Sequence, residues 1–276
     1  MKLKSFDGLR FCLPFRTFTT QLICSLPFVA FAALLTVFLS ATCQGQDGRQ
    51  LFHKMQTALG GSDKIAAIQD FDQCVRADAW TDKGKPYGEV YKRTRWIRPN
   101  VLRLDQIGPG NSYVLYFNGV SGWEILPDKG FVELVGEELA FAKGYLNGID
   151  LKSWLADRDS ANVFTVSGTN VITISTKNDD SQKTEITLDI VTFLPVKEAS
   201  ISLADASPPV ATRTRQFEGW DVFQGVKFPC RIINFHGEKK VADIRAQQIM
   251  LDGGIRSEDL AIRPQGLKPD MSQCGK

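Results

Sequence analysis

From residue 70 onward, most of the chain alternates between apolar and polar positions with a period of two residues, which is typical of half-buried β-strands. Leu102 and Leu104 alternate with Arg103 and Asp105 in one such segment. Asn118-Gly119 is a strong signal for a hairpin turn between two strands. Turn residues separate the alternating segments, so the pattern predicts strands at 71–80, 87–96, 101–105, 113–117, 121–126, 131–134, 162–167, 170–176, 183–189, 195–203, 211–220, 226–236 and 239–251.

Two segments with apolar residues at helical spacing accompany the strands. The segment 46–59 ends at a Gly-Gly pair, and a short helical turn follows it. The segment 136–148 begins with acidic residues and has Leu139, Tyr145 and Leu146 on one face. The sequence therefore predicts a mainly β (α+β) fold, in which a large antiparallel sheet curls. Because an open sheet must bury one face, we expect the mid-chain helix either to fill the core or to form a lid over a ligand groove.

The N-terminal residues have the pattern of a secretory signal. Four basic residues precede an uncharged apolar run at 22–39, and small or polar residues follow it. An uncleaved membrane anchor is the alternative, since this run is at the lower limit of what spans a bilayer. Lipidation at Cys43 is a further alternative, although the residues before it do not match a bacterial lipoprotein signal. We expect a signal at 1–45, a domain at 46–255 and a poorly ordered tail at 256–276.

The charge balance excludes one class of partner. The whole chain has 33 basic and 31 acidic residues, of which the first 45 residues contain four and one, so 29 basic and 30 acidic residues remain. No block of like charge is present in this part. Nucleic-acid binding is therefore excluded, because it requires a basic patch.

Sequence motifs for catalysis and metal binding are absent. The chain has no G-x-S-x-G, H-E-x-x-H, G-x-x-x-x-G-K-[ST] or G-x-G-x-x-G motif. His53 and His236 have no carboxylate or cysteine at ligand spacing, so no metal or other cofactor is expected. Glu137 and Glu138 are adjacent and point to different sides of a helix, so they do not form an acid–base pair. We expect a protein without catalytic residues, and an enzyme that uses scattered carboxylates is the alternative.

The number and spacing of the cysteines do not define a pattern of disulfide bonds. Cys74, Cys230 and Cys274 follow the predicted signal, and their number is odd. Export permits a disulfide between Cys74 and Cys230, which both lie in predicted strands. Unpaired structural thiols are the alternative that the sequence favours.

Several motifs of the segment 94–128 occur in the same order in a known family. Arg98-Pro99-Asn100 ends one strand, Arg103 lies within the next, and an apolar strand leads to the Asn-Gly turn. The following strand contains Trp123 and ends at Pro127. Together with the Leu-Gly-Gly sequence after the leading helix, this order resembles the LolA/LolB-like family of periplasmic lipoprotein carriers and receptors. The resemblance extends from the leading helix to about residue 251.

The resemblance implies an incomplete, strongly curved antiparallel barrel with helices over its open side. It further implies an apolar cavity that binds a lipid or the acyl chains of a lipoprotein. We expect a monomer, with an envelope donor or acceptor protein as a further partner. The residues expected to line the cavity are Trp96, Leu102, Leu104, Leu115, Phe117, Trp123, Ile125, Leu139, Tyr145 and Leu146. For each of them, ordinary core packing is the alternative, and the sequence does not define which face of the sheet is concave.

Arg103 is the polar candidate for the site. We expect it to contact a ligand head group or to tie down the lid, and a solvated position on the strand face is the equal alternative. The alternative function is an envelope scaffold that binds another protein and has no lipid cargo. The expected location is the periplasm, or the membrane if the N-terminal segment stays uncleaved.

Overall fold

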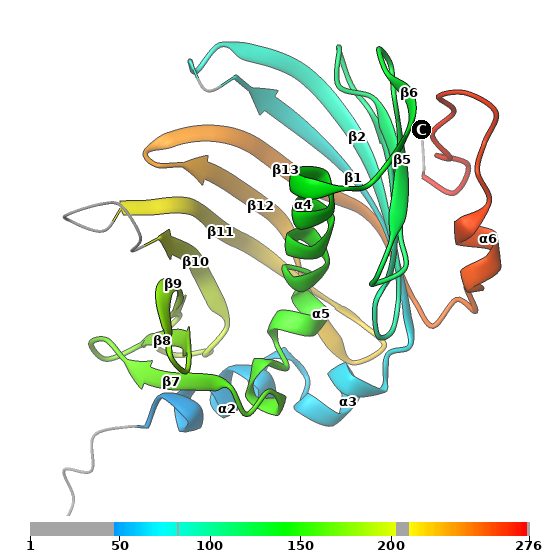
Figure 1. The fold of residues 1–276 in the computed structure, drawn as a ribbon. Coiled ribbons are helices and arrows are strands. Elements are labelled where there is room, and N and C mark those ends of the chain that lie inside the picture. Colours follow the sequence, from blue (N-terminus) through cyan, green and yellow to red (C-terminus); the bar gives the residue numbers. More distant parts are fainter. Residues whose placement is uncertain (1–46, 82, 203–209, 275–276) are drawn as a thin grey trace, which may run out of the picture. The chain divides into compact units, whose positions relative to one another are not determined.

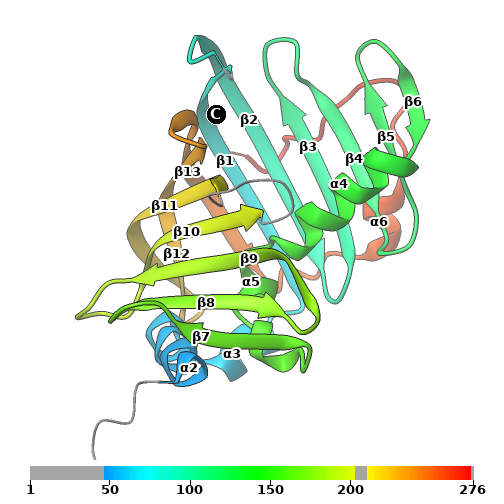
Figure 2. The same ribbon diagram turned by 60° about the vertical axis from the view of Figure 1, so that its left-hand side comes forward.

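One curved antiparallel sheet dominates the structure. The computed structural model describes residues 47–81, 83–202 and 210–274, so the predicted signal and Cys43 lie outside the described residues. Thirteen strands of the described part form a single sheet that curves strongly without closing (Figures 1 and 2). The predicted mainly β, curled antiparallel architecture is therefore confirmed. Within the same residues, no helix combines the length and the apolar character needed to cross a bilayer.

The strand order shows that the sheet consists of two consecutive groups of strands. β1 to β6 pair in succession outward from the middle, and β7 to β13 return so that β13 pairs with β1. β6 and β7 are therefore the two edges of the sheet. The strands are β1 (Asp70–Trp80), β2 (Pro86–Ile97), β3 (Val101–Ile107), β4 (Tyr113–Phe117), β5 (Gly122–Leu126), β6 (Gly130–Glu133), β7 (Asn162–Val166), β8 (Val171–Thr176), β9 (Asp179–Leu188), β10 (Pro195–Ser202), β11 (Val210–Phe223), β12 (Val226–His236) and β13 (Lys239–Leu251).

Two helices cover one end of the curved sheet (Figure 1). Asp47 caps the first of them by accepting a hydrogen bond from the N–H of Arg49 at 3.1 Å. Gly60 ends this helix with a φ of +124°, and a Cβ at this position would collide with the carbonyl of Gly225. The helices of the structure are α2 (Gly48–Leu59), α3 (Ser62–Ala67), α4 (Gly136–Asn147), α5 (Asp150–Ser153) and α6 (Ser257–Ala261), with a 3-10 helix η1 (Ala156–Arg158).

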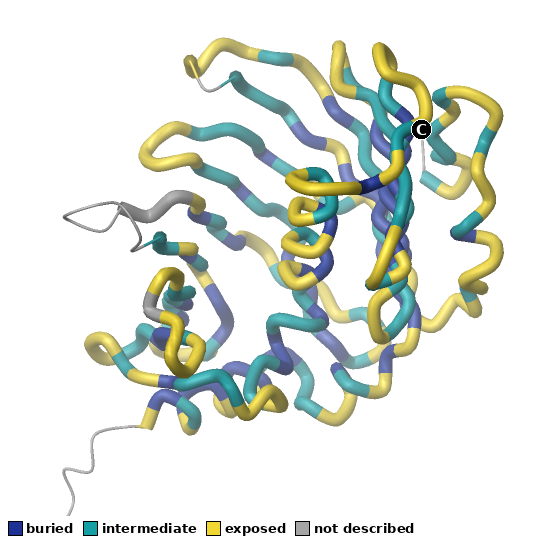
Figure 3. Tube along the Cα trace, in the orientation of Figure 1, coloured by how far each residue is buried: buried dark blue, intermediate teal, exposed yellow. Residues whose placement is uncertain are grey.

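The connection from β6 to β7 crosses the open side of the sheet. α4, α5 and η1 follow one another between these edge strands, and α4 and α5 pass in front of the concave face (Figures 1 and 2). Ala142 and Leu146 of α4 are buried against the core, and Leu139 and Tyr145 pack on it. Buried positions run along α2 and along the inward side of α4 (Figure 3). The predicted mid-chain helix and its apolar face are confirmed.

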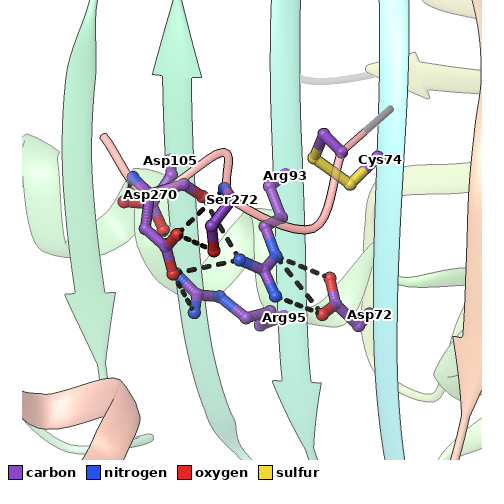
Figure 4. The surroundings of a disulfide bond; sticks show 8 residues. Asp72, Cys74, Arg93, Arg95, Asp105, Asp270 and Ser272 are labelled. Carbon is purple, nitrogen blue, oxygen red and sulfur yellow. Dashed lines mark hydrogen bonds and ion pairs between the residues drawn. A yellow bond between two sulfur atoms is a disulfide. The ribbon is translucent and has the colours of Figure 1, made fainter. Parts of the chain in front are cut away.

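The C-terminal tail, residues 252–274, packs on the convex face, although the sequence predicted poor order for most of it. The carboxylate of Asp70 accepts hydrogen bonds from the N–H groups of Gly253 and Gly254 at 2.8 and 2.9 Å. At its other end, Cys274 forms a disulfide with Cys74 of β1 (Figure 4). The favoured expectation of unpaired thiols is therefore wrong for Cys74 and correct for Cys230, and the permitted Cys74–Cys230 disulfide is not formed.

An arginine–aspartate cluster lies between this tail and the sheet (Figure 4). The side chain of Asp105 is 0% exposed and accepts hydrogen bonds from Arg95 at 2.5 Å and from Arg103 at 3.0 Å. Asp270 of the tail pairs with Arg93 at 3.0 Å and with Arg95 at 2.8 Å. The cluster has three cations and three anions, so its charges balance: Arg93, Arg95, Arg103, Asp72, Asp105 and Asp270.

The same contacts set the protonation state of the tail carboxylate. Burial alone would raise the pKa of Asp270, but hydrogen bonds from Ser272 and the charges of Arg95 and Arg93 lower this pKa to about 2. Asp270 is therefore ionised at neutral pH and connects the tail to the sheet as a charged group.

Candidate ligand-binding site

A cavity of about 220 Å³ lies between the concave face of the sheet and the α4–α5 segment. Strands β1, β2, β11, β12 and β13 form its walls, and Tyr145, Ile149, Asp150 and Leu151 form its cover. A cavity of about 150 Å³ with an apolar lining is enough to bind benzene. The cavity is therefore large enough for a small apolar group or a segment of an acyl chain.

The concave face changes from apolar to polar along β1 to β4. The strand register aligns side chains of these strands in rows across the sheet. The first row, at the end of β2 that contacts α3, contains Phe71, Trp96, Leu102 and Phe117. The second row contains Gln73, Thr94, Leu104 and Leu115. The third row, toward the β1–β2 hairpin, contains Val75, Lys92, Gln106 and Tyr113. The face is thus fully apolar at its helix-covered end and becomes polar away from it.

Lys92 and Tyr145 bring the sheet and α4 together at the polar side of the cavity. The Nζ atom of Lys92 lies 4.2 Å from the centroid of the Tyr145 ring. The hydroxyl oxygen of Tyr145 lies 3.2 Å from that of Thr94, within hydrogen-bond distance. Burial alone would raise the pKa of the Tyr145 phenol, but the Lys92 ammonium and the Thr94 hydroxyl lower this pKa below its ordinary value.

Arg215 of β11 connects the second half of the sheet to the cover. Its guanidinium lies 2.8 Å from the carboxylate of Asp150 in α5 and 3.5 Å from that of Glu198 in β10. The three side chains are largely buried, with exposed fractions of 24%, 17% and 16%. This contact holds the start of α5 against the sheet.

The residues predicted to line a cavity do not all lie at the cavity described above. Of these residues, Tyr145 lines it. Seven others belong to the packed core beside it: Trp96, Leu102, Leu104, Leu115, Phe117, Leu139 and Leu146. The five strand residues among them are at most 1% exposed, so in this structure they form the filled part of the concave face. Their contact with a ligand stays a prediction.

Trp123, Ile125 and Arg103 lie on the convex face, away from the cavity, as the strand register shows. Arg103 donates hydrogen bonds to the carbonyls of Leu260 at 3.0 Å and Ile262 at 2.7 Å. It therefore ties down the C-terminal tail, whereas the sequence suggested a lid contact, a ligand contact or a solvated position. The physical reason is that the tail buries a second face of the sheet, so that large side chains on both faces resemble core residues.

Comparisons with known proteins define the fold. No protein-family model and no curated protein matches the sequence. The structure is similar to that of a LolA superfamily protein from Nitrosomonas europaea, with 14% identity, a TM-score of 0.51 and coverage of 76% of this chain and 97% of that chain. It is also similar to that of a DUF1329 family protein from Desulfovibrio piger, with 11% identity, a TM-score of 0.53 and coverage of 78% and 98%. The chain has a LolA-like fold, and identities this low show the fold alone.

We expect Asp150→Asn to loosen the cover of the cavity. Arg215 then loses the nearer of its two carboxylates, and a hydrogen bond to a charged group contributes about 1.5–3 kcal/mol. Since Glu198 remains, the free energy of unfolding should fall by about 1–2 kcal/mol. Amide hydrogen exchange in α4 and α5, followed by mass spectrometry, should become faster.

Asp78→Asn is the matched control for this variant. It removes a more exposed ion pair with Arg245, at 2.9 Å, between β1 and β13. Exposed pairs of this kind contribute about 0–1 kcal/mol, and exchange in α4 and α5 should not change. If exchange in these helices is also unchanged in the Asp150→Asn protein, the ion pair does not hold the cover.

Proposed function

We propose that the protein binds the acyl chain of a lipid or lipoprotein, without catalysis, in the cavity between the sheet and α4–α5. The main support is the position of this cavity, which lies beside the apolar rows of an unclosed sheet and beneath a connection that covers its concave face. Burial of an acyl chain contributes about 0.8 kcal/mol per methylene. Part of one long chain is therefore enough for reversible binding.

Entry of a longer chain requires movement of the cover. The present cavity is smaller than the about 300–1,000 Å³ that is usual for pockets enclosing drug-sized ligands. Polar contacts between the cover and the sheet side include Tyr145 with Thr94 and Asp150 with Arg215. Lys152 adds a hydrogen bond to the side chain of Asn100 at 3.0 Å. Displacement of α4 and α5 would break these contacts and expose the buried side chains of Ala142, Leu146 and Leu151, and it would enlarge the cavity.

Three features support a place in the bacterial envelope. The N-terminal sequence has the pattern of an export signal. The Cys74–Cys274 disulfide fits an oxidising compartment, because disulfides are rare in the cytosol. The LolA-like fold agrees with the sequence resemblance to periplasmic carriers. In this role the protein receives its cargo from one envelope component and delivers it to another.

A substitution that fills the cavity tests this function. Ala246 of β13 lines the cavity, and Ala246→Phe places a ring in the space that we assign to the chain. If the ligand loses contact for two methylenes, it loses about 1.6 kcal/mol, and its Kd rises by at least about tenfold. Titration with a fluorescent fatty acid measures this change.

Ala242→Phe provides the control, because Ala242 is on the same strand and outside the cavity lining. Added bulk at either position costs about 1–3 kcal/mol of stability, so thermal melting must show that both variants are folded. We expect the Ala242→Phe protein to bind like the wild type. Unchanged uptake by folded Ala246→Phe would show that the acyl chain does not occupy this cavity, and it would contradict the proposal.

A further inference from the structure

The third row of the concave face contains a cation next to the cavity. Lys92 lines the cavity together with Thr94 and Gln73, and its side chain is partly buried. Its neighbours in the row are Gln106 of β3 and, beyond it, Tyr113 of β4. The polar end of the cavity therefore combines one ammonium group with side chains that donate neutral hydrogen bonds.

No carboxylate of the described residues forms an ion pair with Lys92, whose ammonium group interacts with the hydroxyls of Tyr113 and Tyr145 and with the Tyr145 ring. Asp150, which also lines the cavity, pairs with Arg215. Glu124 of β5 faces the same side of the sheet as Leu115, three strands from Lys92. Three strand spacings of about 4.8 Å and an offset of one row along the strand place its backbone roughly 16 Å from that of Lys92.

The protonation state of Lys92 follows from its neighbours in the cavity. Burial alone would lower the pKa of the ammonium group, but the oxygens of Tyr113 and Tyr145 raise this pKa above its ordinary value. Lys92 is therefore a cation at neutral pH. An anion bound beside this ammonium group can accept charge-assisted hydrogen bonds from it, which are stronger than hydrogen bonds between neutral groups.

We infer that Lys92 binds the anionic head group, a carboxylate or a phosphate, of the amphiphile whose chain occupies the cavity. This inference rests on the proposed function and names the class of its ligand. The acyl chain of the amphiphile lies toward the apolar first row, and its head group lies at the third row. Thr94 and Gln73 of the neighbouring second row also line the cavity and can donate further hydrogen bonds to its oxygens.

The test compares ligands that have the same chain and different head groups. Dodecanoate, dodecyl phosphate and dodecanol are titrated into the purified protein at neutral pH, each in competition with a fluorescent acyl probe. We expect at least one of the two anions to bind at least about tenfold more tightly than dodecanol, because charge-assisted hydrogen bonds are about twice as strong as neutral ones. A clear preference for one anion identifies the head group as carboxylate or phosphate.

Substitution of the lysine locates this preference. Lys92→Met keeps the length and apolar stem of the side chain, and we expect it to weaken binding of the anion about tenfold with less than about a twofold effect on dodecanol. Lys92→Arg keeps the cation and should keep the preference. Lys54→Met is the matched control, since Lys54 of α2 also lies over an aromatic ring, that of Phe193 at 5.2 Å, but outside the cavity.

The possible results separate the inference from the function on which it rests. Equal binding of dodecanol and both anions, or a preference that survives in folded Lys92→Met, overturns the inference and leaves the acyl-chain function in place. Binding of none of the three ligands overturns both. If Lys92→Met does not fold, the head-group comparison in the wild-type protein and in Lys92→Arg decides.

Discussion

Asp105→Asn should lower the free energy of unfolding by about 3–5 kcal/mol, the largest effect that we expect from a single substitution. The Asp105 side chain is 0% exposed, and it accepts hydrogen bonds from Arg95 and Arg103 and from the backbone N–H of Asp270. The amide cannot provide the negative charge that balances these guanidinium groups. Removal of one partner of a buried ion pair leaves a charge without compensation. This lowers stability more than replacement of the whole pair by apolar residues.

Chemical denaturation measures this loss, with Glu89→Gln as the control. Glu89 pairs with Arg76, and both side chains are more than 40% exposed. This pair contributes about 0–1 kcal/mol, so the control should unfold close to the wild type. A loss below about 1 kcal/mol in Asp105→Asn would show that water reaches the arginine–aspartate cluster. In that case the tail would not seal the convex face.

The second large effect concerns the disulfide of the tail. The double variant Cys74→Ser with Cys274→Ser opens a bond between residues 200 positions apart in the sequence. Removal of a native disulfide typically costs about 2–5 kcal/mol, because the unfolded chain gains freedom. We expect a loss of this size in the free energy of unfolding, together with faster amide exchange in residues 256–274.

Cys230→Ser is the matched control for this variant. Cys230 is a free thiol that donates a hydrogen bond to the carboxylate of Asp221, with the two atoms 3.2 Å apart. The serine hydroxyl can make the same contact, so the stability should change little. A double variant as stable as the Cys230→Ser protein would mean that the disulfide does not stabilise the fold.

The sequence predicts the sheet well because its signals are local. Alternation places Leu102 and Leu104 opposite Arg103 and Asp105, and the strand register has them on opposite faces. Turn residues mark the ends of nearly every strand, and Gly119 has the positive φ of 94° that its hairpin turn requires. The spacing of its apolar residues likewise predicts the mid-chain helix.

The tail could not be predicted in the same way. Its position depends on Asp270, which meets Arg93 and Arg95 from more than 170 residues away in the sequence. The pairing of Cys274 depends on the same long-range arrangement, and three cysteines do not define their connectivity. A short segment with two prolines has no periodic pattern of its own, so it resembles a disordered end.

The candidate site was predicted in part for a related reason. The sequence predicts Tyr145 as a site residue because Tyr145 lies on the apolar face of α4. Lys92 was missed, although the alternation that places Trp96 inward also places Lys92 inward, four residues earlier. Arg215 and Asp150 come from distant segments and meet through the fold alone.

Native mass spectrometry of the protein, purified gently from its own envelope, tests the central claim most directly. We predict a population with a single bound lipid or acylated species, which solvent extraction releases and identifies. Added dodecanoate or dodecyl phosphate should replace it in the wild type and much less in Ala246→Phe. A folded wild-type protein that carries no such adduct, and takes up none of the added ligands, would contradict acyl-chain binding and favour an envelope scaffold.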